Sequence, residues 1–325
     1  MFIYLITYLM MSQQRSIQIT NKFALHEYNI TCITLLHNGK YASCSEDKAI
    51  KIFSIKYNNN NNESSIPFPH IELEYLNAHE LCITWITELI NSTNTLVTCS
   101  FDSFIKFWKV NANSIELIHS IKTETTGNTK VISLTNNRIA VSSSNWTITI
   151  FNSVSPYDKL ALLKQHNDVV NSIIQVKDKE TLISVSEDNT LIVWDLISYQ
   201  MLLIFDEIYS SSPASLIELY GKYIVIGGRG WISLLEVDSY VLLNYIENEE
   251  QPNTTYMSFI EGDVNNNTFI CGTTNGELNE VDINTNEITN SIALDNGIIN
   301  TLNKLNNSTF MAGTSFGFVI FYNYK

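Results

Sequence analysis

The stretch HNDVVNSIIQVKDKETLISVSEDNTLIVWDL, residues 166–196, contains three short apolar segments separated by polar breaks. The segments are residues 169–176, 181–186 and 190–196. Apolar and polar residues alternate in each, and Val, Ile, Thr and Leu predominate, which is typical of β-strands. The break at 187–189, Glu-Asp-Asn, indicates a tight hairpin, because Asp and Asn tolerate the backbone angles of turns. The stretch therefore predicts three successive antiparallel strands.

The same unit recurs along the whole chain. With Asp188 as the reference, the equivalent turn positions are Asp47, Asp102, Asn145, Asp188, Gly230, Asn275 and Phe316. After a first interval of 55 residues, these positions are 41 to 45 residues apart, which is the length of a four-stranded propeller blade. Six residues further on, five of the seven units have an aromatic residue: Phe53, Trp108, Phe151, Trp194 and Tyr322. The period predicts an all-β fold, a seven-bladed β-propeller of four-stranded antiparallel blades.

Four residue types at fixed places make the clearest units resemble the WD repeat. They are a His before the first strand, a Ser or Thr at the end of the second, an Asp in the turn and a Trp in the third strand. In that family the four side chains form a hydrogen-bonded tetrad within one blade. The resemblance implies tetrads of His26, Ser45, Asp47 and Phe53 in blade one, His79, Ser100, Asp102 and Trp108 in blade two, and His166, Ser186, Asp188 and Trp194 in blade four.

The resemblance covers residues 16–325 and is weaker in the other blades. Blade three has Asn145 in place of Asp and no His near its start. The last three blades keep small residues at the end of the second strand and apolar alternation in the third. In WD propellers the first strand of the chain completes the last blade. We therefore expect residues 16–24, which have no preceding partner, to close the ring beside residues 317–322.

Two segments lie outside the repeat. Residues 1–11 carry no charge and are too few to span a bilayer, and they lack the basic start of a signal peptide. We expect residues 1–15 to be a disordered leader or an incorrectly assigned start, and residues 16–325 to be one propeller domain. The Asn-rich segment 56–69 accounts for the long first interval. We expect it to be a polar loop insertion.

Charge and cysteine content limit the classes of partner. The chain has 33 acidic and 19 basic residues and a net charge of -14, which disfavours nucleic acids and membrane surfaces. We expect protein partners with basic binding surfaces. The five cysteines form no CxxC pair and show no metal-ligand spacing, so we expect reduced thiols, no bound metal or cofactor, and an intracellular protein, cytoplasmic or nuclear.

The sequence predicts no catalytic residue. Groups of His, Asp and Ser recur at blade spacing, whereas an enzyme needs one such group with an exposed nucleophile. We therefore expect a non-catalytic interaction scaffold or adaptor that is a subunit of a multiprotein complex. Two alternatives stay open at this point: a propeller-fold hydrolase that acts on a modified protein, and a substrate adaptor of a ubiquitin ligase.

In WD propellers, partners most often dock on the top face, where the turns between the second and third strands meet the connections between blades. By resemblance, this face would include Asn29, Glu46, Cys82, Phe101, Ser144, Val169, Glu187, Arg229, Thr274 and Ser315. Phe101 and Arg229 are the strongest candidates, because aromatic residues and Arg are enriched at binding hot spots.

Overall fold

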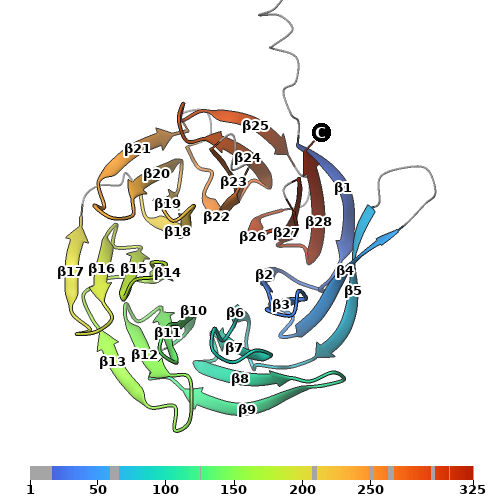
Figure 1. Ribbon diagram of the computed structural model, residues 1–325, viewed down its shortest axis with the longest axis vertical. Helices are drawn as coiled ribbons and strands as arrows, with labels where there is room; N and C mark the ends of the chain where they lie inside the picture. Colours follow the sequence, from blue (N-terminus) through green and yellow to red (C-terminus); the bar gives the residue numbers. More distant parts are fainter. Residues whose placement is uncertain are drawn as a thin grey trace, which may run out of the picture.

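The computed structural model describes residues 17–58, 66–124, 126–206, 211–248, 252–262, 267–293, 297–306 and 308–324. Its strands form seven four-stranded antiparallel sheets, arranged radially around a central axis (Figure 1). The all-β, seven-bladed propeller predicted from the repeat period is confirmed.

Each blade runs from an innermost strand a to an outermost strand d. Blade one is β2 (Ile30–Leu35), β3 (Tyr41–Ser45), β4 (Ile50–Asn58) and β5 (Ile66–Tyr75), and blade two is β6 (Ile83–Glu88), β7 (Thr95–Ser100), β8 (Phe104–Val110) and β9 (Ile115–Lys122). Blade three is β10 (Asn128–Leu134), β11 (Arg138–Ser143), β12 (Ile148–Asn152) and β13 (Lys159–Leu163), and blade four is β14 (Val170–Gln175), β15 (Thr181–Ser186), β16 (Leu191–Asp195) and β17 (Met201–Phe205). Blade five is β18 (Pro213–Leu219), β19 (Tyr223–Gly228), β20 (Trp231–Glu236) and β21 (Leu242–Glu247), and blade six is β22 (Tyr256–Glu261), β23 (Thr268–Thr273), β24 (Glu277–Asp282) and β25 (Ile288–Ala293). Blade seven is β26 (Ile299–Lys304), β27 (Thr309–Thr314), β28 (Phe318–Tyr324) and β1 (Ile17–Ala24).

The ring is closed by the first strand of the chain, as predicted. β1 pairs antiparallel with β28, with Phe23 opposite Val319, and so becomes the outer strand of blade seven. Sequence-distant ends of the chain therefore share one sheet, which Figure 1 shows as β1 lying along β28.

The hydrophobic core is divided among the blade interfaces. The buried apolar residues that the structure describes form seven clusters, one between each pair of neighbouring blades. Successive side chains of a strand point to opposite faces of its sheet. In β8, for example, Phe107 packs against blade three and Trp108 packs against blade one. The middle strands are therefore apolar on both faces, and each blade is stabilised mainly by its two neighbours.

A closed ring of hydrogen bonds joins the innermost strands. Each strand a has a register shift after its first residue, which marks a β-bulge. At this point a polar side chain donates to the first backbone carbonyl of the next blade's strand a, over 2.7 to 3.4 Å. The seven donor and acceptor pairs are Thr31 and Ile83, Thr84 and Asn128, Thr129 and Val170, Asn171 and Pro213, Ser215 and Tyr256, Ser258 and Ile299, and Asn300 and Ile30. We call this set the inner ring.

A second series of bonds links neighbouring blades at the other end of strand a. In five blades the polar side chain near the end of strand a accepts a backbone N–H of the preceding blade, over 2.6 to 3.0 Å. The acceptors are Glu88, Ser133, Gln175, Glu218 and Glu261. At these five interfaces the adjacent blades are thus joined near both ends of strand a.

The predictions for the two segments outside the repeat differ in how far the structure describes them. The predicted leader, residues 1–15, lies outside the described residues. The Asn-rich segment 56–69 is not wholly a loop, because residues 56–58 belong to β4 and residues 66–69 to β5, where Tyr57 pairs with Pro67. A proline is tolerated here because β5 is an outer strand whose free edge needs no N–H donor. Residues 59–65 lie outside the described residues.

Candidate functional site

In blade four, a buried chain of hydrogen bonds connects the turn to the third strand. His166 Nδ1 lies 3.1 Å from a carboxylate oxygen of Asp188, and Nε2 lies 2.7 Å from Ser184 Oγ. Trp194 Nε1–H donates to the same Oγ over 2.9 Å. The hydroxyl that joins His to Trp therefore belongs to Ser184, and the assignment of this role to Ser186 was wrong.

The same correction applies to the other two predicted tetrads. His26 contacts Ser43 rather than Ser45, and His79 contacts Thr98 rather than Ser100, each over 2.8 Å. In blade two Trp108 Nε1–H donates to Thr98 Oγ1 over 2.8 Å. The residue two places earlier in strand b lies deeper in the blade, level with the His and Trp rings.

The predicted serines have another role, which is to hold the turn. Ser186 Oγ accepts the backbone N–H of Asp188 over 3.2 Å and donates to the carbonyl of Asp168 over 3.0 Å. Ser45 and Ser100 accept from Asp47 and Asp102 in the same way, both over 3.0 Å. These serines therefore tie the b–c turn to the connection that enters the blade.

Blade one has the same chain without its last donor. His26 Nδ1 lies 2.8 Å from Asp47, but Phe53 has no polar group to contact Ser43. Phe53 is fully buried and its ring stacks on Tyr41, with 5.6 Å between the ring centroids. Phe53 thus replaces the hydrogen bond of a Trp with aromatic packing.

The aspartates of these turns have lowered pKa values and are ionised at neutral pH. Burial raises the pKa of Asp102. The hydrogen bond and charge of His79, together with two backbone N–H donors, outweigh burial and lower this pKa to about 2. The same causes, with His26, lower the pKa of Asp47 to about 2. Burial lowers the pKa of His79 despite the neighbouring carboxylate, so the neutral ring is favoured at neutral pH. Because a carboxylate only accepts, the neutral ring of His79 donates through Nδ1 to Asp102 and accepts through Nε2 from the Thr98 hydroxyl.

The remaining blades hold their turns by other contacts. In blade three Thr126 Oγ1 donates to Asn145 over 2.5 Å, and in blade six Asn275 donates to Thr254. In blade five the fully buried Trp231 lies against Gly228, where a Cβ would be 2.2 Å from the indole. The small residue at this position is therefore required by the Trp231 side chain. Trp231 was not among the residues predicted from the sequence.

These buried groups are structural in character. The three His rings are between 2 and 6 % exposed, so none presents a nucleophile or base to a substrate. Within the described residues no group of three or more His, Cys, Asp or Glu is placed to hold a metal ion. The described chain also contains no helix with the length and apolar character of a membrane span.

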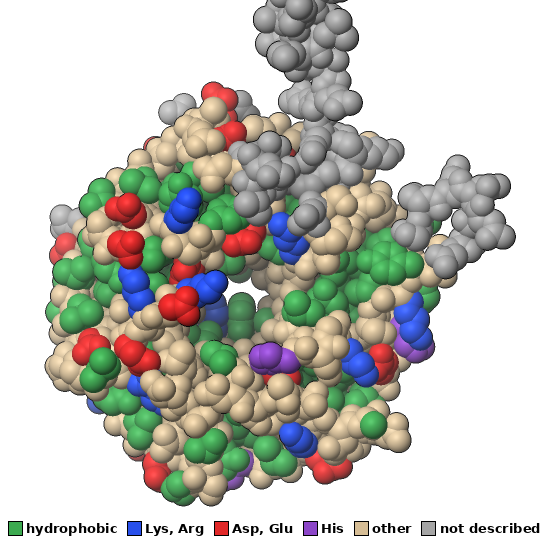
Figure 2. All heavy atoms as spheres, in the orientation of Figure 1, with side chains coloured by type: hydrophobic (Ala, Val, Ile, Leu, Met, Phe, Trp, Pro, Cys, Tyr) green, Lys and Arg blue, Asp and Glu red, His purple; other side chains and the backbone are tan. Residues whose placement is uncertain are grey.

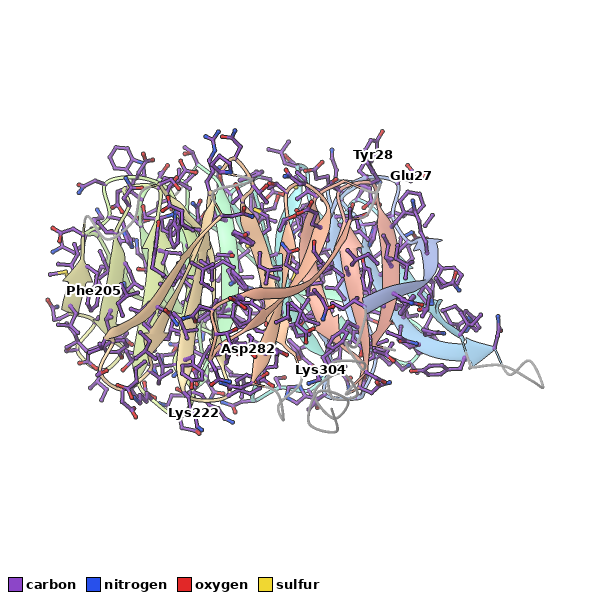
Figure 3. All side chains as sticks on the ribbon, turned by 90° about the horizontal axis from the view of Figure 1, so that it is seen from above. Glu27, Tyr28, Phe205, Lys222, Asp282 and Lys304 are labelled. Atoms are coloured by element: carbon purple, nitrogen blue, oxygen red, sulfur yellow. The ribbon has the colours of Figure 1, made fainter. Side chains whose placement is uncertain are left out.

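The predicted top-face residues lie where b–c turns meet the connections between blades. Backbone N–H groups of Glu46, Phe101 and Glu187 donate to the carbonyls of Asn29, Cys82 and Val169, respectively, over 2.9 to 3.3 Å. Figure 3 places Glu27 and Tyr28, from one such connection, on one side of the disc, which we call the top face; Lys222, Lys304 and Asp282 lie on the opposite side, the bottom face.

Exposure separates the predicted residues into two groups. Glu46, Phe101, Glu187 and Arg229 are exposed. The partly buried positions are Asn29, Cys82, Ser144, Val169, Thr274 and Ser315. Phe101 and Arg229 belong to blades two and five, on opposite sides of the channel in Figure 1, so the structure does not bring these two candidates together.

Four consecutive blades expose large apolar side chains on the top face. They are Phe316 of blade seven (60 % exposed), Tyr28 of blade one (60 %), Leu81 and Phe101 of blade two (50 and 48 %), and Trp146 of blade three (50 %). We call these five residues the apolar arc. In blade four the equivalent positions are Asp168, Glu187, Asp188 and Asn189. Only Phe101 was predicted, although an aromatic residue at a turn position that is polar in other units was the available signal.

Acidic residues border the apolar arc. Glu27, Glu46 and Glu80 are exposed in the turns and connections of blades one and two. Arg229 lies apart from them in blade five, where its Nη2 donates to Asn253 over 2.6 Å. The arc therefore combines exposed apolar area with negative charge.

Comparison with known proteins agrees with this geometry. The family model described as WD domain, G-beta repeat matches residues 17–54, 72–109 and 157–195. The chain therefore contains three WD repeats within a seven-bladed β-propeller. The fold is similar to that of the WD40 β-propeller domain of Doa1, with a TM-score of 0.75 over 94 % of this chain and 97 % of that one. The two sequences are 14 % identical, so this similarity concerns the fold alone. The matched segments contain the three His-containing chains of blades one, two and four.

Proposed function

We propose that this WD-repeat propeller is a non-catalytic scaffold, a subunit of a multiprotein complex that binds partner proteins on its top face. WD40 propellers are typical of protein-interaction scaffolds. The observation that supports the proposal most is the apolar arc. Exposed apolar side chains grouped on one face, within a polar surround, are a mark of protein-binding surfaces.

The charge of the arc defines the class of partner. Glu27, Glu46 and Glu80 lie among its apolar side chains, and the whole chain has a net charge of -14. A partner segment with one or two aromatic or aliphatic anchors flanked by Lys or Arg would complement both features. The acidic surface disfavours nucleic acid and anionic membrane as ligands.

The proposed location is intracellular, in the cytoplasm or nucleus. All five cysteines are free, and Cys32, Cys44, Cys99 and Cys271 are fully or almost fully buried within strands. Burial raises the pKa of the Cys32 and Cys99 thiols to about 12, so they stay protonated and unreactive. Buried free thiols in such number fit a reducing compartment.

The test is quantitative affinity purification of the tagged chain and two arc variants, Phe101→Ala and Phe316→Ala. We expect both to lose the stoichiometric partners of the unaltered chain without a change in melting temperature, because neither side chain is buried. Leu35→Ala, which alters an equally exposed apolar residue in β2, is the matched control. The predicted hot spot Arg229 is tested by Arg229→Glu, which should weaken only contacts that extend to blade five.

An unchanged set of partners in both arc variants would show that the arc is not the docking surface. Turnover of a substrate by the purified chain would instead support the hydrolase alternative. Co-purification of ubiquitin-ligase subunits would support the adaptor alternative.

A further inference from the structure

The central channel contains a cavity of about 420 Å³. Its walls are the seven innermost strands, and Figure 2 shows its opening in the middle of the ring. The lining consists mainly of Ser, Thr and Asn side chains and aliphatic residues, with Trp85 and Phe259. Among these lining residues Lys130 alone is charged. Among the described residues that line this cavity, an acidic protein thus places one cation and no carboxylate.

Lys130 occupies a position that holds a small side chain in most blades. The equivalent residues, second after the first residue of each strand a, are Cys32, Trp85, Ser172, Ser215, Ser258 and Thr301. Lys130 is the neighbour of Trp85 on one side and of Ser172 on the other. Its Nζ lies 4.4 Å from the centroid of the Trp85 ring and donates to Ser172 Oγ over 3.0 Å. The ammonium is therefore held between two blades.

The ammonium has no negative counterpart in the described part of the chain. Lys130 is 8 % exposed, and it forms no ion pair with a described carboxylate. The titratable groups that act on it are the thiols of Cys32 and Cys99, whose raised pKa of about 12 keeps them neutral. Burial accordingly lowers the pKa of Lys130 to about 8. A buried charge without a partner is costly, and a bound anion would remove that cost.

From these contacts we infer that the channel is a binding site for a small organic monocarboxylate, with Lys130 as the group that binds its charge. Lys130 Nζ has N–H groups besides the one directed at Ser172, and the Ser172 hydroxyl, which accepts from Nζ, donates to no described acceptor. These two neighbouring donors match the two oxygens of a carboxylate. Trp85 and the aliphatic walls of the cavity would contact the apolar part of such a ligand. One cation matches a monoanion better than a phosphate, which carries more charge.

The test uses benzoate as the probe, titrated into the full chain by calorimetry, with benzamide as its neutral analogue. We expect benzoate to bind and benzamide to bind at least tenfold more weakly, because the neutral amide cannot form the charge-assisted hydrogen bonds of a carboxylate. Lys130→Met removes the charge at similar length and should weaken benzoate binding at least tenfold. Lys130→Arg should retain most of the affinity for benzoate.

Lys222→Met is the control, since it removes the same charge from an exposed site on the bottom face. It should bind benzoate like the unaltered chain. Affinity should also fall between pH 7 and pH 9.5 in the unaltered chain and not in Lys130→Met. The inference is overturned if benzoate and benzamide bind alike, if Lys130→Met binds as well as the unaltered chain, or if inorganic phosphate binds and benzoate does not. Since Lys130 lies in the channel and not in the apolar arc, these results are independent of partner binding.

Discussion

Replacing Ser184 with Ala should cost far more stability than replacing Ser186, although the two serines are two residues apart and both fully buried. Ser184 Oγ serves two buried groups, the Nε2 of His166 and the Nε1–H of Trp194. A buried polar group that loses its partner costs about 1–3 kcal/mol, so Ser184→Ala should lower the free energy of unfolding by about 2–4 kcal/mol. Ser186 serves a turn that water can reach, and its loss should cost about 1 kcal/mol.

The assay is urea unfolding followed by tryptophan fluorescence and circular dichroism, with stability taken from the midpoint and slope. Ser184→Thr is the matched control, because Thr98 fills the same position in blade two and makes the same two contacts. The free energy of unfolding of Ser184→Thr should stay close to that of the unaltered protein. A loss for Ser186→Ala that equals or exceeds the loss for Ser184→Ala would refute the assignment of the shared hydroxyl.

Two further predictions concern the inner ring and the turn aspartates. Thr129→Val keeps the shape of the side chain but leaves the carbonyl of Val170 without its donor; it should cost about 1 kcal/mol in urea unfolding, and unaltered stability would show that the bond contributes little. Asp47 and Asp102 have a pKa of about 2 in the folded protein against an ordinary value of 3.8, so they contribute stability above about pH 4 that is lost as pH falls toward 2. Asp102→Asn should flatten the decline of melting temperature over this interval, and an unchanged decline would contradict the linkage.

The blade number and the closure of the ring could be predicted because they depend on local signals. Turn residues at Asp102, Asn145 and Asp188 recur every 43 residues, and the unpaired segment 16–24 has one free position to fill. The sequence could not show which of two nearby residues at the end of strand b contacts the His and Trp side chains. Ser184 and Ser186 lie on the same side of β15, are equally small and differ only in depth, which the sequence does not record.

The inner ring was missed for a different reason. Its donors are Thr, Asn or Ser, and in blades five and six the donor moves from the bulge residue to the next one, as in Ser215 and Ser258. No fixed residue at a fixed spacing marks it. The apolar arc was missed because its members come from different places in the unit: Tyr28 from a connection, Trp146 and Phe316 from turns. Only the circular arrangement places them on neighbouring blades.

The inner ring explains how the channel can carry an unusual pair of side chains without weakening the closure. In blades two and three the ring bond comes from the bulge residue, Thr84 or Thr129. The next residue in each strand, Trp85 or Lys130, makes no ring bond and can vary. In blades five and six, where Ser215 and Ser258 carry the bond themselves, a large or charged residue at that position would break the ring. The large and the charged side chain thus occur where the bulge residue leaves their position free, which is the arrangement expected of a ligand site added to an intact ring.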